Sequence, residues 1–240
     1  MPKTLTKHEG DTPDNVILVG YSGSHAYGLT HTGYTDPISG EQMPPSDEDI
    51  RGVFVEPTES ILSLGVRKQL VEQRLVDTNY DEIERFMVLC LAASPGSLDV
   101  LGSPITFNPP DGYLLLGNAD IFVSRKVGHS YQGYAVGQDS KAKKRTVHKT
   151  KPMMHAIRAL LTGKQILKEG YITVGMSEHR DLLLSILFGE MRQVHYSQLF
   201  DKLLGQLVSA ETASKLPIVP DRTKANEILL QIRRNNLGWD

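Results

Sequence analysis

The hydrophobic pattern of this 240-residue chain changes its period near residue 77. Upstream, apolar and β-branched residues run through 16–21 and 49–55, and a weaker alternation covers 66–76; such runs predict β-strands. Downstream, from Ile83, apolar residues recur at helical spacing as far as Pro95, which predicts an amphipathic helix. Further helices are expected over 117–136, 151–168, 177–193, 195–209 and 222–235, the last of them capped by Asp221. Strands followed by helices predict an α+β protein, with a small mixed β-sheet and a helical C-terminal region.

Bulk composition excludes several classes of protein. A formal net charge of −2 argues against a globally basic nucleic-acid binder, although it permits a local basic groove. The single cysteine, Cys90, excludes an intramolecular disulfide and a thiolate metal cluster, and its place in an apolar stripe predicts a core position. Since no apolar run approaches the ~18 residues of a membrane span and no secretory segment is visible, we expect a soluble, cytoplasmic protein without a membrane partner.

Two carboxylates stand two residues apart at the head of the second predicted strand. Because side chains alternate along a strand, Asp47, Asp49 and Arg51 are expected to share one face, with Glu48 and Ile50 on the other. Paired carboxylates repel unless a cation lies between them, and Mg²⁺ commonly takes one or two carboxylates together with substrate phosphates. Upstream, Gly23-Ser24 follows the first strand and predicts a tight turn suited to binding phosphate. The pattern therefore predicts a site for phosphoryl or nucleotidyl transfer.

Several motifs together resemble the DNA-polymerase-beta-like nucleotidyltransferase superfamily, and more narrowly its RNA-ligase-associated branch in bacteria and phages. The resemblance covers about residues 16–192, and 22 residues separate Ser24 from Asp47, which is long for the pattern. The matching elements are Gly23-Ser24 with Ala26-Tyr27-Gly28, Ser46-Asp47-x-Asp49-Ile50-Arg51-Gly52, Tyr80-x-Glu82-Ile83-x-x-Phe86, Ser94-Pro95-x-x-Leu98-Asp99, Gly133-Tyr134-Ala135-x-Gly137-Gln138 and Lys151-x-x-Met154-His155-x-x-Arg158.

The resemblance implies a flexible N-terminus over 1–15, a nucleotidyltransferase catalytic core over 16–110 and a helical substrate-binding region over 111–240. It implies a carboxylate triad that holds two Mg²⁺ (or Mn²⁺) ions, with Asp47 and Asp49 as the first two members. Asp77, at the end of the third predicted strand, is our prediction for the third; it could instead cap the following helix.

The same resemblance suggests the nucleotide-binding residues. Gly23 and Ser24 would bind the β- and γ-phosphates, and Arg51 would either neutralise the triphosphate or hold a catalytic aspartate in place. Helical spacing places Lys151, His155 and Arg158 on one face, and Lys126 with His129 forms a similar basic pair. Either face would line the nucleotide or acceptor pocket, or else be a solvated surface. The prediction for nucleotide binding comprises Gly23, Ser24, Arg51, Lys126, His155 and Arg158.

The expected reaction is transfer of an NMP from an NTP such as ATP to a hydroxyl acceptor. The family's association with RNA ligases suggests an RNA 3′ end, in tRNA or a repair substrate. The basic run from Lys141 to Lys151 follows Tyr131 and Tyr134, a combination that suits a single-stranded RNA end but is also common in a solvated loop. Transfer to a protein side chain or a small molecule, and a non-catalytic nucleotide- or RNA-binding module, remain alternatives.

Overall fold

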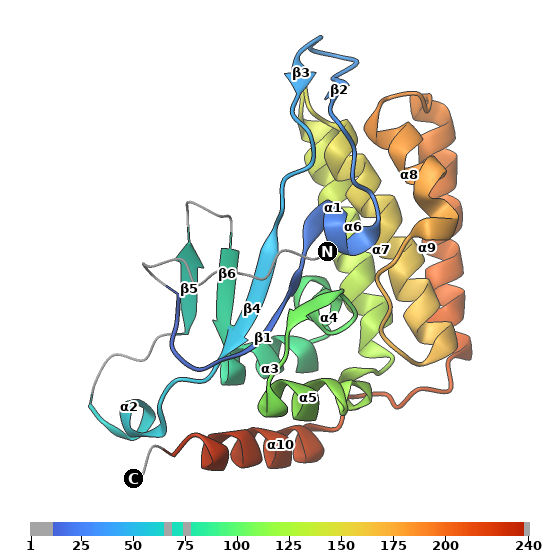
Figure 1. Cartoon of the computed structure of the whole chain (residues 1–240). Helices are drawn as coiled ribbons and strands as arrows, with labels where there is room; N and C mark the ends of the chain where they lie inside the picture. The colour runs from blue at the N-terminus through green and yellow to red at the C-terminus, as the bar shows by residue number, and fades with distance from the viewer. Residues whose placement is uncertain (1–11, 65–68, 74–77, 238–240) are drawn as a thin grey trace.

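The computed structural model describes residues 12–64, 69–73 and 78–237. Its centre is a five-stranded sheet in the order β5-β6-β4-β1-β7, with helices on one of its faces and at one side (Figure 1). The strands are β1 (Val16–Tyr21), β2 (Tyr34–Thr35), β3 (Gln42–Met43), β4 (Ile50–Phe54), β5 (Leu70–Gln73), β6 (Thr78–Glu82) and β7 (Ile105–Phe107). The helices are α1 (Gly23–Tyr27), α2 (Thr58–Leu62), α3 (Ile83–Leu91), α4 (Pro95–Leu101), α5 (Pro110–Leu116), α6 (Lys126–Lys144), α7 (Thr150–Glu169), α8 (Arg180–Leu187), α9 (Gln193–Ala213) and α10 (Arg222–Asn235), with 3₁₀ turns η1 (Ala119–Phe122) and η2 (Ser177–His179).

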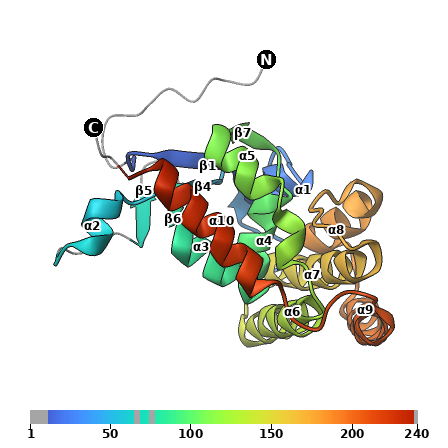
Figure 2. The same cartoon turned by 90° about the horizontal axis from the view of Figure 1, so that it is seen from below.

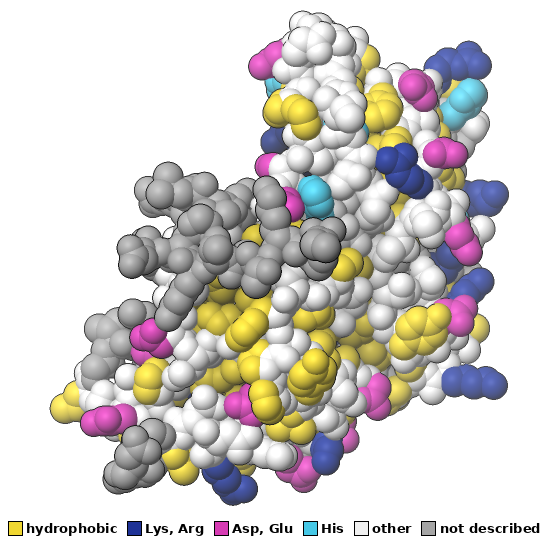
Figure 3. All heavy atoms as spheres, viewed as in Figure 1, with side chains coloured by type: hydrophobic (Ala, Val, Ile, Leu, Met, Phe, Trp, Pro, Cys, Tyr) yellow, Lys and Arg dark blue, Asp and Glu magenta, His cyan; other side chains and the backbone are white. Residues whose placement is uncertain are grey.

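The sheet is mixed because β4 pairs antiparallel with β1 on one side and parallel with β6 on the other. Leu18 pairs with Val53 on the face that packs against the helices, and Figure 2 shows α3 and α4 on that side of the sheet. The opposite face carries a smaller apolar cluster of Val19, Ile50, Phe54 and Tyr80. Hydrophobic side chains gather over the lower part of the sheet in the view of Figure 3. The alternation expected for β4 thus places Ile50 and Arg51 on opposite faces.

One apolar core joins the sheet to the helical region. It runs from Ile17 in β1 to Ile232 in α10 and includes the expected Cys90, which is fully buried. Within it, α7 packs between α6, α8 and α9, and Gly163 lets α7 approach the Tyr131 ring of α6 closely. The predicted domain division at 110/111 stays a prediction. Among the described residues, no helix is both long and apolar enough to span a bilayer.

Strands β2 and β3 form a hairpin that projects beyond the sheet (Figure 1). Two contacts near its tip tie it to the helical region. His148, between α6 and α7, lies 3.4 Å from a carboxylate oxygen of Asp36 and 3.2 Å from one of Glu41. Gly189, after α8, has a positive φ, and any Cβ there would collide with the Pro37 ring. The hairpin therefore has a defined seat on the helical region.

Some expected elements are confirmed and others are wrong; among the latter, the helix expected over 177–193 is a 3₁₀ turn followed by α8, which ends at Leu187. The strand over 16–21, the strand over 49–55 and the helices near 151–168 and 222–235 are confirmed, and Asp221 caps α10 by accepting a hydrogen bond from the Lys224 N–H. Strand β6 was not predicted, because its sequence Thr-Asn-Tyr-Asp-Glu is short and polar and only its neighbours β4 and β5 make it a strand. The helix expected over 117–136 begins instead at Lys126, after a 3₁₀ turn, and α4, β7 and α5 were missed.

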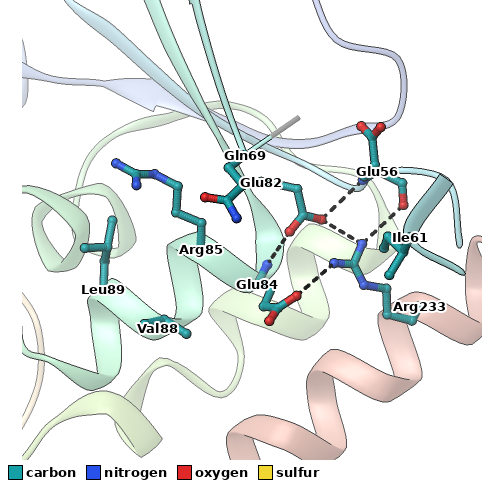
Figure 4. A pocket seen from close by; sticks show the side chains of 9 residues that line it. All are labelled: Glu56, Ile61, Gln69, Glu82, Glu84, Arg85, Val88, Leu89 and Arg233. Atoms are coloured by element: carbon teal, nitrogen blue, oxygen red, sulfur yellow. Dashed lines mark hydrogen bonds and ion pairs between the residues drawn. The ribbon is translucent and has the colours of Figure 1, made fainter. Parts of the chain in front are cut away.

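The C-terminal helix is fastened to the sheet by a buried ion pair, drawn in Figure 4. The Arg233 guanidinium of α10 lies 2.6 Å from Glu82 Oε1, and it also donates to the Glu56 carbonyl oxygen at 3.2 Å. The side chains of Arg233 and Glu82 are only 12% and 7% exposed, so neither charge is well solvated. Glu82 also accepts hydrogen bonds from the Glu56 and Glu84 N–H groups, and so joins β6, α3 and α10.

We expect Arg233→Ala to lower the free energy of unfolding by about 3 kcal/mol, because removing one partner of a buried pair leaves the other charge uncompensated. Urea denaturation of the full chain measures this. Arg234→Ala is the matched control: Arg234 is the next residue of the same helix, it is exposed, and its loss should change the free energy by less than about 0.5 kcal/mol. Equal effects of the two variants would contradict the assignment.

Candidate functional site

The end of β1 and the start of β4 lie side by side and bring the two sequence motifs together. Tyr21 pairs with Ile50, and the Ser22 N–H donates to the Asp49 carbonyl oxygen at 2.8 Å. The chain then turns at Gly23, where φ is +55°, into the short helix α1. A Cβ at Gly23 would collide with the Asp49 carboxylate. Glycine is required here both by the left-handed backbone and by the close approach of the carboxylate.

A cavity of about 400 Å³, here called the larger compartment, opens between α1, the hairpin and the start of α7. The Asp47 and Asp49 side chains both line it, together with Ser24 and Lys151. Much of its wall is apolar. The remaining residues that line it are Gly23, Tyr27, Leu29, His31, Tyr34, Met43, Pro44, Pro45, Ser46, Met154, His155 and Leu187.

A second cavity of about 230 Å³, the smaller compartment, adjoins the first and shares Gly23, Tyr27, Asp49 and His155 with it. It lies between the upper ends of β4 and β6 and the helices α6 and α7, and polar side chains dominate its wall. The residues that line the smaller compartment but not the larger one are Ser22, Ile50, Arg51, Asn79, Tyr134 and Arg158. Asp49 therefore stands where the two compartments meet.

Arg158 is almost fully buried, and a network around Asp99 holds it. Asp99 of α4 accepts hydrogen bonds from Arg158 at 3.0 Å, from the Tyr27 hydroxyl at 2.8 Å and from the Tyr131 hydroxyl at 3.2 Å. The guanidinium carbon also lies 3.7 Å from the centre of the Tyr27 ring, a cation–π contact. Burial raises the pKa of both tyrosines, so they stay protonated and act as donors. Nε of Arg158 has no hydrogen-bond partner among the described residues.

Two histidines of the site, His155 and His31, are neutral at physiological pH because burial lowers the pKa of each. Burial, with smaller contributions from Arg158 and Lys151, lowers the pKa of His155 to about 3. Burial also lowers the pKa of His31, and the charge of Lys151 adds to that effect while Asp47 opposes it. His31 Nδ1 accepts a hydrogen bond from the Gly33 N–H at 3.2 Å, so its proton lies on Nε2.

The structure brings together most of the residues predicted from the sequence. Gly23, Ser24, Asp47, Asp49, Arg51, His155 and Arg158 line one or both compartments. Glu48, expected to face away, is exposed and lines neither of them. Asp77 lies outside the described residues. Within the described part of the chain, no group of three or more His, Cys, Asp or Glu side chains is arranged to hold a metal ion.

Lys126 is not brought to this site. It lies at the start of α6 in a separate groove with Arg125 and His129, opposite Glu211 of α9, and its ammonium group donates to the Leu91 carbonyl oxygen at 3.4 Å. The helical pattern placed Lys126 and His129 on one face correctly, but it could not show that this face lines a groove with α9 rather than the site.

The basic run from Lys141 to Lys151 begins within α6 and is therefore not a loop throughout. Lys141, Lys143 and Lys144 form the last turn of α6, where positive charge is favourable, and Lys143 pairs with Asp139 at 2.6 Å. The earlier pairing of this run with Tyr131 as a stacking residue is wrong, because Tyr131 is completely buried and bonded to Asp99.

His31, Tyr34 and Asn79 also line the site, and no local pattern in the sequence marks them. Asn79 belongs to the unpredicted strand β6, and its parallel pairing with Arg51 carries it to the smaller compartment. The length of the segment between Ser24 and Asp47 is the sequence signal for this additional wall.

Comparison with known proteins gives a family match over most of the chain. The model of the RNA repair pathway DNA polymerase beta family matches residues 1–229. Among solved structures, the chain is similar to a nucleotidyltransferase-like protein from Exiguobacterium sibiricum, with 10% sequence identity and a TM-score of 0.31; the likeness covers 92% of this chain and 75% of that one. A search of curated proteins found no match.

Burial of neutral His155 predicts a loss of stability in acid. The unfolded chain binds a proton at this residue below its ordinary pKa of 6.5, whereas the folded chain does so only near pH 3. Stability is therefore full above pH 6.5 and falls as the pH drops from 6.5 towards 3. Between pH 7 and pH 5 this group should cost about 2 kcal/mol.

Denaturation of the wild type and of His155→Asn at pH 7 and pH 5 checks this expectation. The variant should lack that part of the pH dependence, and His195→Asn, at an exposed position, should retain it. If His155→Asn kept the wild-type pH dependence, His155 would not be the buried neutral group.

Proposed function

Because the chain belongs to the RNA repair pathway DNA polymerase beta family, we propose that it is a metal-dependent nucleotidyltransferase that transfers an NMP from an NTP to the hydroxyl of an RNA 3′ end, in tRNA or a repair substrate. Family membership supports nucleotidyl transfer in general. The metal and the RNA acceptor are the parts that we propose.

One observation carries the proposal: Asp47 and Asp49 line the same compartment as the Gly23-Ser24 turn. Carboxylate oxygens are hard ligands, and Mg²⁺ is commonly held by one or two of them while substrate phosphates complete its shell. The two aspartates fit this donor set, and we propose Asp77 as a third ligand. When bound, the ion would neutralise charge on the triphosphate and activate the acceptor hydroxyl.

The chain's own residues would bind and orient the substrate. Ser24 offers a hydroxyl donor close to the carboxylates. Arg51 and Arg158 line the smaller compartment with two guanidinium groups, of which Arg158 is fixed by Asp99. Neutral His155 lies where the compartments meet and can hydrogen-bond to a phosphate or a hydroxyl without changing the charge of the site. A polar, partly enclosed site of this kind strengthens every such interaction.

Asp47→Asn and Asp49→Asn should each reduce nucleotidyl transfer by at least about a thousandfold, because a bound metal contributes several kcal/mol to such reactions. The measurement is incubation of the purified chain with each α-³²P-labelled NTP and Mg²⁺, with and without total RNA, followed by a denaturing gel. Glu48→Gln is the matched control: this carboxylate stands between the two aspartates in sequence, lies outside both compartments, and should be silent.

The gel also distinguishes the acceptors. Label in RNA that requires both aspartates supports the proposal, and the labelled nucleotide identifies the preferred NTP. Label in the protein band points to a protein side chain as acceptor, and label in neither overturns transfer to RNA. Transfer that survives in both aspartate variants would mean that the site is wrongly placed.

If RNA is the acceptor, the basic turn at the end of α6 should contribute to its binding. Changing Lys143, Lys144 and Arg145 to Gln should lower RNA affinity about tenfold or more and reduce the slope of log affinity against log salt by up to about 2. A gel-shift titration over a range of salt concentrations measures both. The control changes three exposed cations of α10, Arg222, Lys224 and Arg234, to Gln, and should leave both quantities unchanged. A salt slope that is the same in both triple variants would exclude this turn from the RNA interface.

A further inference from the structure

We propose that the larger compartment binds the nucleobase of the NTP, and that residues 31–46, which form its outer wall, determine which nucleotide is used. This inference rests on the proposed function and deepens it. It assigns a role to the long segment between Ser24 and Asp47, for which neither the carboxylate pair nor the Gly-Ser turn accounts.

The first argument is the contrast between the two compartments. The larger one is walled by Leu29, Met154 and Leu187 from the core side and by Tyr34, Met43, Pro44 and Pro45 from the hairpin segment. The smaller one is lined by Arg51, Asn79 and Arg158. Asp49 stands between the two compartments, so a ligand with its phosphates at the carboxylates can reach either of them. Of these two cavities, which adjoin Asp49 in the described part of the chain, only the larger has the apolar wall that a flat, weakly polar group needs. Its volume of about 400 Å³ is in the range of small-ligand pockets.

The second argument is that this wall is held firmly from several directions. His31, Tyr34 and Phe188 form an aromatic cluster with ring centroids 5.3 to 5.9 Å apart. Arg180 of α8 donates to the carbonyl oxygens of Gly28 and Thr30 at 3.0 and 2.8 Å, where the segment begins.

The anchors at the tip of the hairpin are the Pro37–Gly189 contact and His148 between Asp36 and Glu41. A wall fixed both at its start and at the hairpin tip is preorganised, so little conformational entropy is lost when a planar group packs against it.

The wall also carries polar groups beside its apolar surface. The Ser46 hydroxyl oxygen accepts a hydrogen bond from the His31 N–H at 3.0 Å, and both residues line the compartment. His31 Nδ1 accepts from the Gly33 N–H, so its ring can offer Nε2–H as a donor, and Lys151 lines the same compartment. Apolar surface with a few fixed donors is the composition that lets a pocket discriminate between heterocycles of similar shape.

The test separates the base from the phosphates. Binding of four α,β-methylene NTP analogues and of inorganic tripolyphosphate, each with Mg²⁺, is measured by calorimetry on the full chain. The variants are Tyr34→Ala and Met43→Ala in the wall and Arg51→Gln in the smaller compartment. Met191→Ala is the matched control for Met43→Ala, because Met191 is similarly half-buried but does not line the cavity.

We expect the wild type to bind at least one analogue about tenfold or more tightly than tripolyphosphate, since packing a base on a side-chain surface commonly contributes that much. Tyr34→Ala and Met43→Ala should remove about five- to tenfold of the analogue's affinity and leave tripolyphosphate within twofold. Arg51→Gln should weaken both ligands, and Met191→Ala neither. The melting temperature of each variant shows whether it still folds. If Tyr34→Ala disturbs folding, Met43→Ala alone tests whether the wall binds the base.

The other outcomes overturn the inference in distinguishable ways. Analogue and tripolyphosphate binding with equal affinity, or analogue affinity unchanged in both wall variants, would exclude the base from the larger compartment while leaving the proposed transferase intact. Equal weakening of both ligands by the wall variants would place the phosphates there instead. Absence of binding by every ligand to the folded wild type would count against the proposed function itself.

Discussion

The pairing of β1 with β4 is the constraint on which the site depends. It places Ser22 beside Asp49, with the Ser22 N–H on the Asp49 carbonyl oxygen, so the turn after one strand meets the carboxylates before the other. Gly23 then has to lack a side chain, because the Asp49 carboxylate occupies the space of its Cβ. Two motifs 22 residues apart in sequence thereby become one surface.

Asp99 is the second organising point, because it joins the sheet unit to the long helices. One carboxylate accepts from Tyr27 of α1, Tyr131 of α6 and Arg158 of α7. A buried ion pair contributes little net stability compared with an apolar pair, since both charges lose water. Its consequence here is geometric: it fixes the guanidinium of Arg158 at the wall of the smaller compartment, close to Asp49.

Some of the site was visible in the sequence because its signals are local. The β-branched runs ending at Tyr21 and beginning at Ile50 define strands, and their period shows which residues share a face. The helical spacing of His155 and Arg158 likewise places them on one side of α7. Lys126 shows the limit of such reasoning: the same spacing is satisfied on a face that lies in another groove.

The sequence by itself determined the α+β order, the strands that carry the Gly-Ser turn and the carboxylates, and the family, since these follow from hydrophobic period and short motifs. Only the tertiary structure decided that Thr78–Glu82 is a strand, that Tyr131 is a buried donor and that residues 31–46 wall a cavity. The physical reason is that burial and pairing are properties of neighbours distant in sequence. A polar strand, a tyrosine in a helix and a Gly- and Pro-rich segment acquire their roles only when other elements pack against them.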